Sequence, residues 1–355
     1  KLTGLLIDNA VDLVGAKVPE ANSTQVKEAL DAAQQACFAV GLTTVDDCGL
    51  HFREVLTIDS LQKRGELKMR VYAMLSDIKE NYEFLFDRGA LKTDLLNVRS
   101  FKVYADGALG SRGACLLQPY TDRQDWSGFL LSNLPHFDSV ANIIQNKGFQ
   151  MCTHAIGDSA NRAILNIYGK YLKGNNDQRW RIEHAQVLNE ADFSLFGKYS
   201  IVPSVQPTHA TSDMYWAGER LGKERESGAY AFKQLMDQNG WIPLGTDFPV
   251  EDISPFKTFL AAVFRQDATG FPREGYQMEG ALSREQAIRG MTIWAARSNF
   301  EEREKGSIEK GKFADFIMLD RDLMTVKGAD VLNTTVMATY LGGTKVYSRQ
   351  VVGTK

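Results

Sequence analysis

The stretch GFQMCTHAIGDSANRAI, residues 148–164, joins a strand to a helix through a short turn and carries a histidine at the junction. Residues 148–155 form the short apolar run that is typical of a buried strand. After Gly157, apolar residues recur at three- and four-residue spacing and predict an amphipathic helix, with Asp158 or Ser159 as its N-cap. His154 is therefore expected where the strand ends.

The same alternation of strand and helix continues through most of the chain, which indicates a parallel α/β fold. Strands are predicted at residues 41–48, 68–75, 99–106, 148–155, 179–186, 200–207 and 240–247. A (β/α)8 barrel of the TIM type has eight such units, so these seven are one short of it. We expect a TIM-like (β/α) barrel over residues 1–300. The glycine turns and β-rich runs of residues 301–355 predict a small β segment.

Composition restricts the class of protein. The 355 residues carry a net charge of −3, with 44% hydrophobic and 24% charged residues, as in ordinary globular proteins. This balance argues against nucleic acid or a membrane surface as partners. The four cysteines form no CxxC pair, so the reducing cytoplasm is the default location. Because the chain begins at Lys1 without a methionine, we expect a processed or truncated N-terminus, and a signal peptide before it stays open.

Polar residues occupy the ends of the predicted strands, where a barrel of this type places its active site. They are Lys102, His154, His184 and Asp247. Alternation along the strands puts Cys152 on the face of His154, and Ile182 on the face of His184. Two histidines and a carboxylate are good ligands for zinc or a similar divalent ion. A carboxylate beside such an ion can also take a proton from a water molecule, because the metal lowers the pKa of that water.

Each of these residues has an ordinary structural interpretation as well. A single strand-end histidine is more often a hydrogen-bonding residue than a ligand. Asp247 could cap the following segment, and a strand lysine such as Lys102 is usually solvated or paired. Cys152 beside His154 could be a thiol nucleophile, although a buried structural cysteine is commoner. The metal interpretation therefore depends on several of these residues lying together.

Most of these single residues belong to longer sequence motifs. In order along the chain they are KVYADGALGSRGA (102–114), THAIGD (153–158), RIEHAQ (181–186), QPTHATSD (206–213), LGTDFPVED (244–252) and GSIEKGKFADFIMLD (306–320). Together they resemble the YtcJ-like branch of the metal-dependent amidohydrolase superfamily, over nearly the whole chain. The resemblance implies a hydrolase that uses one or two divalent ions, with zinc as the first choice, and a small-molecule substrate.

The resemblance also implies roles for individual residues. The implied metal ligands are Lys102, which is often carbamylated in the superfamily, and His154, His184 and Asp247. Asp247 would also act as the general base. The implied substrate or oxyanion contacts are His209 and Asp213, and Arg112 would anchor a polar substrate group. A structural ion pair is the equally weighted alternative for Arg112.

One feature of the superfamily is missing from the sequence. The five histidines, His51, His136, His154, His184 and His209, form no His-x-His pair. The resemblance places that pair on a first strand, which we expect to precede residue 1. It also implies a β-sandwich beside the barrel, with residues 301–355 as one part of it and the other half before residue 1. Such a chain would have an open barrel seam and unpaired tail strands, which favour association, so a homo-oligomer is a candidate. Without the pair we expect weak metal binding and little turnover.

Three functions follow as alternatives. The first is metal-dependent hydrolysis of amide-like C–N bonds in small molecules. The second is a non-catalytic or ligand-binding fragment that lacks two metal ligands. The third is an ester or phosphoester hydrolase on the same scaffold, since a fold does not fix a reaction.

Overall fold

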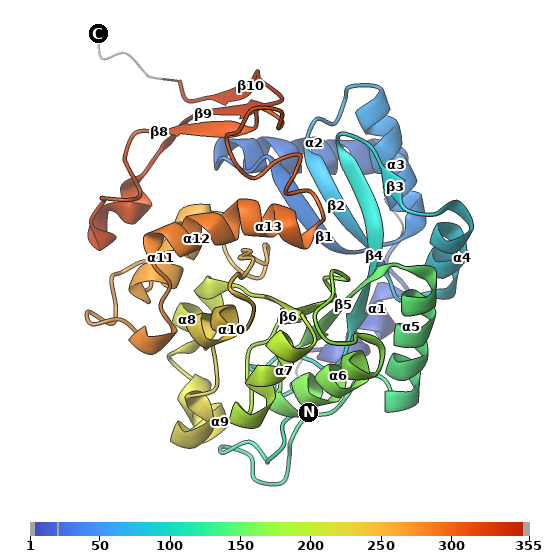
Figure 1. The fold of residues 1–355 in the computed structure, drawn as a ribbon, viewed down its shortest axis with the longest axis vertical. Helices are drawn as coiled ribbons and strands as arrows, with labels where there is room; N and C mark the ends of the chain where they lie inside the picture. Colours follow the sequence, from blue (N-terminus) through green and yellow to red (C-terminus); the bar gives the residue numbers. More distant parts are fainter. Residues whose placement is uncertain (1–3, 20, 351–355) are drawn as a thin grey trace.

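The structure, a computed structural model, describes residues 4–19 and 21–350. Its centre is a curled sheet of parallel strands (Figure 1). The strands of this sheet are β1 (Thr44–Leu50), β2 (Arg70–Ser76), β3 (Leu91–Lys92), β4 (Leu96–Tyr104), β5 (Gln150–Ala155), β6 (Arg181–His184) and β7 (Val202–Ser204). They are ordered β1-β2-β4-β5-β6-β7 with parallel neighbours, and the short β3 pairs antiparallel with β4. A TIM-like fold is therefore confirmed, in the form of a half-barrel.

Helices precede, connect and follow the strands of the parallel sheet. They are α1 (Asp12–Gly15), α2 (Ser23–Ala39), α3 (Phe52–Lys63), α4 (Lys79–Arg88), α5 (Leu134–Lys147), α6 (Asp158–Tyr171), α7 (Phe193–Lys198), α8 (Pro207–Asp213), α9 (Ala217–Glu226), α10 (Phe232–Asn239), α11 (Pro255–Phe264), α12 (Arg284–Met291) and α13 (Ile293–Ser298). Short 3-10 turns are η1 (Asp8–Val11), η2 (Glu190–Asp192), η3 (Met278–Gly280) and η4 (Gly328–Asn333). In the described ranges, no helix is both long enough and apolar enough to cross a membrane.

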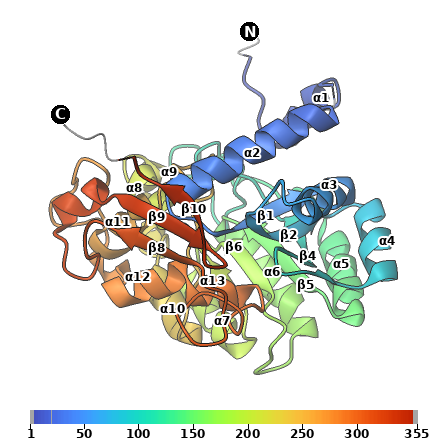
Figure 2. The same ribbon diagram turned by 90° about the horizontal axis from the view of Figure 1, so that it is seen from above.

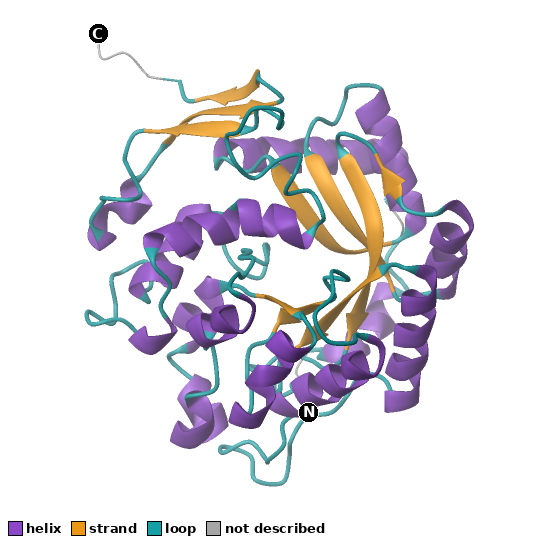
Figure 3. Cartoon of the chain, in the orientation of Figure 1, coloured by secondary structure: helices purple, strands orange, loops and turns teal. Residues whose placement is uncertain are grey.

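The sheet has two differently packed faces. Its outer face is covered by helices, α3 to α7 among them (Figure 3), and the main core lies there, with residues such as Phe101 and Ile164 fully buried. On the inner face, Tyr72, Met74 and Cys152 form a separate buried cluster. Burial raises the pKa of the Cys152 thiol to about 12, so this cysteine is a neutral core residue rather than a nucleophile.

Six of the seven predicted strands are confirmed, and the seventh is much reduced. The run at residues 240–247 contributes only an isolated parallel bridge between Leu244 and Val205. Pro243 has no N–H to donate to a ladder, and it only accepts a hydrogen bond from Val205 N. Within residues 4–19 and 21–350 the sheet does not close, and β1 and the 240–247 run lie at its two edges.

The predicted side-chain cap of the helix after His154 is wrong. Helix α6 begins at Asp158, and its N-cap is Gly157, which has no side chain to offer. The Asp158 carboxylate instead accepts a hydrogen bond from Leu117 N at 2.8 Å, because a long loop from β4 passes over this turn. The local pattern gave the position of the helix correctly but could not reveal a partner 41 residues away.

A separate antiparallel sheet follows near the C-terminus. It consists of β8 (Phe316–Leu319), β9 (Val336–Leu341) and β10 (Thr344–Ser348), in the order β10-β9-β8. This small sheet lies beside α2 (Figure 2), and Thr339 Oγ1 donates to Phe38 O at 2.7 Å. It falls within the 301–355 segment for which a β-sandwich piece is predicted; residues 351–355 lie outside the described ranges.

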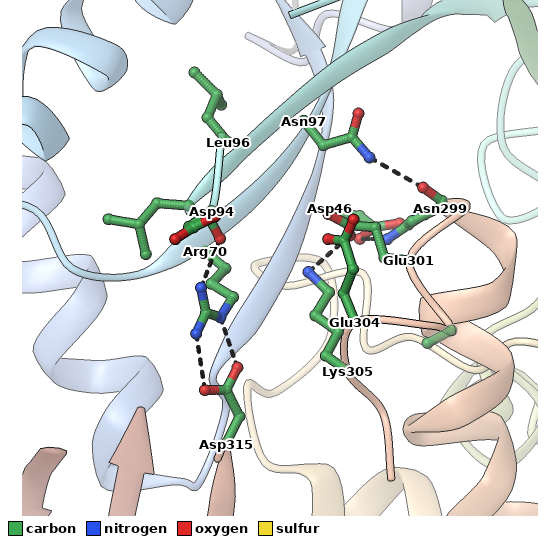
Figure 4. Close-up of polar contacts among 12 residues, drawn as sticks. Asp46, Arg70, Asp94, Leu96, Asn97, Asn299, Glu301, Glu304, Lys305 and Asp315 are labelled. Carbon is green, nitrogen blue, oxygen red and sulfur yellow. Dashed lines mark hydrogen bonds and ion pairs between the residues drawn. The ribbon is translucent and has the colours of Figure 1, made fainter. Parts of the chain in front are cut away.

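A buried ion pair connects the segment that leads into this small sheet to the parallel strands (Figure 4). Arg70 of β2 binds Asp315 through two hydrogen bonds of 2.6 and 3.0 Å. Both side chains are almost completely buried, and the Arg70 guanidinium also lies 4.0 Å from the Phe313 ring centroid. Lys305 pairs with Glu301 at 2.7 Å nearby. The two sheets are thus held together by charged groups as well as by apolar packing.

Candidate metal centre

Three side chains bring potential metal ligands together at the carboxyl ends of the strands. They are His184 at the end of β6, His209 on α8 and Asp247 just after the Leu244 bridge. One ligand atom from each lies within 4.8 Å of the others. His209 Nε2 is 3.5 Å from Asp247 Oδ2, and the His184 and His209 rings are stacked with centroids 5.8 Å apart.

His154 and Lys102 border this group. The ring centroid of His154 lies 4.6 Å from that of His184 and 5.5 Å from that of Tyr104. In the sheet, Tyr104 pairs with His154 and Lys102 pairs with Cys152. Lys102 Nζ lies 4.9 Å from the Tyr104 ring centroid. The structure therefore brings all four implied metal ligands into one region, and adds His209 to them.

Backbone conformation explains how His184 reaches the site. In the register, His154 pairs with Glu183 and Thr153 pairs with Ile182, so plain alternation would send His184 outward with Ile182. Ile182 does lie in the outer core, contrary to the predicted shared face. His184 has a φ of 75°, and this left-handed conformation turns its ring toward His154. Asp247 also has a positive φ, 58°. Such positions cost about 1–3 kcal/mol and are concentrated at functional sites.

The histidines are held in the form that binds metals. Burial lowers the pKa of His154 to about 3, with a contribution from the Lys102 charge, and lowers the pKa of His209 to about 4. Burial also lowers the pKa of His184, to which the neighbouring His154 adds. All three imidazoles are thus neutral near pH 7, and a neutral imidazole has the lone pair that ligation requires.

The hydrogen bonding of these rings also fits a metal ion. His184 Nδ1 donates to Gln206 Oε1 at 2.7 Å, which leaves Nε2 as its ligand atom. His209 Nε2 is buried and has no hydrogen-bond partner among the described residues. A buried nitrogen of this kind is rarely left unsatisfied. Imidazole nitrogens and a carboxylate oxygen form a donor set that suits zinc.

Asp247 and Lys102, which lie beside the histidines, carry opposite charges near neutral pH. Burial raises the pKa of Asp247 to about 6, so it is mostly ionised at pH 7. Burial would lower the pKa of Lys102, but the surrounding Cys48 and Glu183 outweigh burial, and the pKa lies above its ordinary value. Lys102 is therefore an ammonium group in this arrangement.

The remaining predicted residues are Asp213 and Arg112. Asp213 follows His209 by one helical turn; its Oδ2 accepts hydrogen bonds from Tyr230 OH at 2.8 Å and Gln186 Nε2 at 3.2 Å. Burial raises the pKa of Asp213 to about 6. Arg112 forms two hydrogen bonds with Asp122, of 3.1 and 2.7 Å, which is the structural ion pair weighed above.

The sequence motifs placed His209 near the pocket as a substrate or oxyanion contact and missed its position among the candidate metal ligands. They gave no role to Gln206. His209 follows the 200–207 strand run, so its position at the same end of the sheet as His154 was a usable signal. Nothing in the sequence indicated a role for Gln206. Its hydrogen bond to His184 is a side-chain contact between residues 22 positions apart, which a local pattern does not reveal.

Comparison with known proteins gives a consistent assignment. A sequence profile described as "Amidohydrolase family" matches residues 1–347. The chain is 32% identical to "Protein LONG AFTER FAR-RED 3" of Arabidopsis thaliana, over 97% of this chain and 61% of that protein. It is 29% identical to "Putative amidohydrolase YtcJ" of Bacillus subtilis strain 168, over 98% of this chain and 66% of that protein.

A solved structure is similar as well. An uncharacterized metal-dependent hydrolase from Pyrococcus horikoshii OT3 superposes with a TM-score of 0.79 at 27% identity, covering 90% of this chain and 64% of that one. The chain thus spans somewhat less than two thirds of the length of these three proteins.

Proposed function

The chain belongs to the amidohydrolase family, and on this premise we propose that its strand-end site is the metal centre of a hydrolase that acts on amide-like C–N bonds of small molecules. The observation that carries the proposal is the convergence of His184, His209 and Asp247 within 4.8 Å. The family match and the resemblance to a metal-dependent hydrolase support it.

Three of the chain's residues would hold a divalent ion directly, namely His184, His209 and Asp247. Three protein ligands with an open fourth position are typical of catalytic zinc sites, and we propose zinc as the ion. His154 borders the same space and would complete a larger ligand set. Lys102 would join that set only as a carbamate, because its ammonium form has no lone pair to offer. When bound, such an ion polarises a substrate carbonyl and makes a water molecule acidic enough to attack it near neutral pH.

Asp247 is the proposed general base. Its side chain is 35% exposed, so a water molecule and a substrate can reach it. With a pKa of about 6 it is ionised at neutral pH and is close to the value at which proton transfer in both directions is efficient. It would take a proton from the attacking water and deliver it to the leaving amine nitrogen.

The place of His209 changes the expectation of weak metal binding. That expectation counted Lys102, His154, His184 and Asp247 as the remaining ligands, without His209. With His209 in the ligand set, we expect this chain to retain one ion. Carbamylation of Lys102 stays a separate proposal, which a CO2 adduct on the Lys102 peptide in mass spectrometry would test.

The experiment has a metal arm and a substrate arm. The protein is dialysed against zinc and then against buffer, and its metal is counted by elemental mass spectrometry. It is then assayed with chromogenic N-formyl and N-acetyl anilides, matched aryl esters and aryl phosphates. We expect one retained zinc and cleavage of the anilides that a chelator abolishes. Asp247→Asn should lose the activity, whereas Asp252→Asn, at an exposed pair with Lys257, should keep it.

Each contrary result has a distinct meaning. Retained zinc with cleavage of esters or phosphates alone would contradict the C–N bond assignment but not the metal centre. No retained zinc and no turnover would contradict the proposal as a whole.

A further inference from the structure

Asp106 has an unusual environment directly beside the candidate metal centre. It follows β4 by two residues and is only 1% exposed. Its carboxylate accepts three backbone hydrogen bonds: Oδ2 from Cys115 N and Gly157 N, both at 2.8 Å, and Oδ1 from Ile156 N at 3.0 Å. Asp106 therefore ties the loop after β4 to the turn that follows His154.

One acceptor site of this carboxylate remains. An ionised carboxylate offers about four lone-pair sites, and Oδ1 uses only one of its two here. The group that faces Oδ1 is His154 Nε2, at 3.6 Å. This nitrogen is buried and has no hydrogen-bond partner in residues 4–19 and 21–350. An acceptor with a spare site thus lies opposite an unsatisfied ring nitrogen.

We propose that Asp106 is a positioning residue that fixes the tautomer of His154, with the proton on Nε2 and the lone pair of Nδ1 directed to the metal centre. At 3.6 Å the contact is longer than a hydrogen bond, so the attraction is electrostatic, and it favours the proton on the nitrogen nearest the carboxylate. A carboxylate behind a ligating histidine commonly sets ring orientation and basicity in metal sites. The metal part of this inference rests on the proposed function, whereas the tautomer part does not.

The chain offers a matched control in Asp158. This carboxylate is also buried, at 4% exposure, and accepts Leu117 N from the same loop. Within residues 4–19 and 21–350 it forms no ion pair or hydrogen bond with His154, whose ion-pair partner is Asp106. Asp158→Asn therefore weakens the tie between loop and turn without changing the neighbour of the imidazole, whereas Asp106→Asn changes both.

The test measures the tautomer first. Protein labelled with 15N-histidine is studied by long-range 1H–15N correlation at about pH 8, where the Asp106 carboxyl, whose pKa burial raises to about 7, is mostly ionised. His154→Gln assigns the signals. We expect His154 to carry its proton on Nε2 in the unsubstituted protein and to lose this preference in Asp106→Asn. A proton on Nδ1 in the unsubstituted protein would overturn the inference, and no variant needs to fold for this result.

The second readout is zinc affinity, by competition with a chelating dye. We expect Asp106→Asn to weaken zinc binding about 10–100-fold, the usual effect of removing such a partner, and Asp158→Asn to leave it unchanged. Equal losses in both variants would show a structural role alone and overturn the inference. If the unsubstituted protein binds no zinc, the proposed function fails, and the tautomer then decides the role of Asp106 by itself.

Discussion

At the scale of single residues, the site depends on side chains that the backbone and burial hold in unfavourable states. His184 and Asp247 have left-handed φ values of 75° and 58°, and the imidazole of His209 is neutral with a pKa of about 4. A protein keeps such features where the surrounding structure compensates for them. The proposed reason here is ligation of a metal ion by these same groups.

The pKa of His209 predicts how stability changes with pH. Its folded pKa of about 4 lies below the ordinary 6.5, so on acidification the unfolded chain binds the proton first and stability falls from pH 6.5 to pH 4. His209→Gln lacks this loss. We compare the free energy of unfolding of this variant with that of the unsubstituted protein, both without added metal. The difference between them should shift by about 2 kcal/mol in favour of the variant when the pH is lowered from 7.5 to 5. Urea unfolding at both pH values measures it, and an equal difference at the two would contradict the buried neutral state.

His209 and Asp213 should have separable effects. Because the His209 ring lies among the candidate ligands, His209→Asn should weaken zinc binding at least about 10-fold, as expected for loss of a direct ligand. Asp213 lies one turn farther on, bound to Tyr230 and Gln186, so Asp213→Asn should leave zinc affinity unchanged. Dye competition measures both variants. If the zinc affinity of His209→Asn is unchanged, His209 is not a metal ligand, and a substrate contact is again its expected role.

At the scale of elements, the turn between β5 and α6 positions His154 by close contact. A Cβ added to Gly157 would lie 2.0 Å from Cys115 O, so the loop after β4 passes directly over this turn. Together with the Asp106 and Asp158 hydrogen bonds, this contact fixes the end of β5. The turn therefore has little freedom to move.

Two glycine variants at opposite ends of β5 test this arrangement. Gly157→Ala must displace the Cys115 backbone and should cost about 1–3 kcal/mol of stability while also weakening zinc binding. Gly148, the C-cap of α5 two residues before β5, has a φ of 73° but open space around it, so Gly148→Ala should cost about 1 kcal/mol and leave zinc binding unchanged. Denaturant unfolding and dye competition report the two effects. The turn would not be constrained as described if both variants bind zinc normally.

Strands and site residues differed in how far the sequence could predict them. Apolar runs with strand-end polar residues predicted β5 and the place of His154, because both depend on local pattern and on the common edge of parallel strands. The inward turn of His184 could not be predicted, since it depends on a left-handed φ that no side chain at that position requires. The contacts of Asp106 also could not be predicted, because they join loops distant in sequence.

At the scale of the whole molecule, buried charges connect the two sheets. Asp315→Asn removes the opposite charge that pairs with the almost fully buried Arg70, so we expect a loss of about 3–5 kcal/mol and faster hydrogen exchange in β8 to β10. Glu285→Gln, in the exposed pair with Arg289, should cost less than about 1 kcal/mol. Similar small effects in both would show that apolar contacts, not the Arg70–Asp315 pair, hold the small sheet in place.

The central claim is that His184, His209 and Asp247 bind one divalent ion. It is tested most directly by an anomalous difference map, recorded at the zinc absorption edge, from crystals of the zinc-loaded protein. The account predicts a single peak within about 2.0–2.2 Å of a ring nitrogen of His184, a ring nitrogen of His209 and a carboxylate oxygen of Asp247. A map with no peak at these three residues, or with zinc bound only elsewhere, would contradict it.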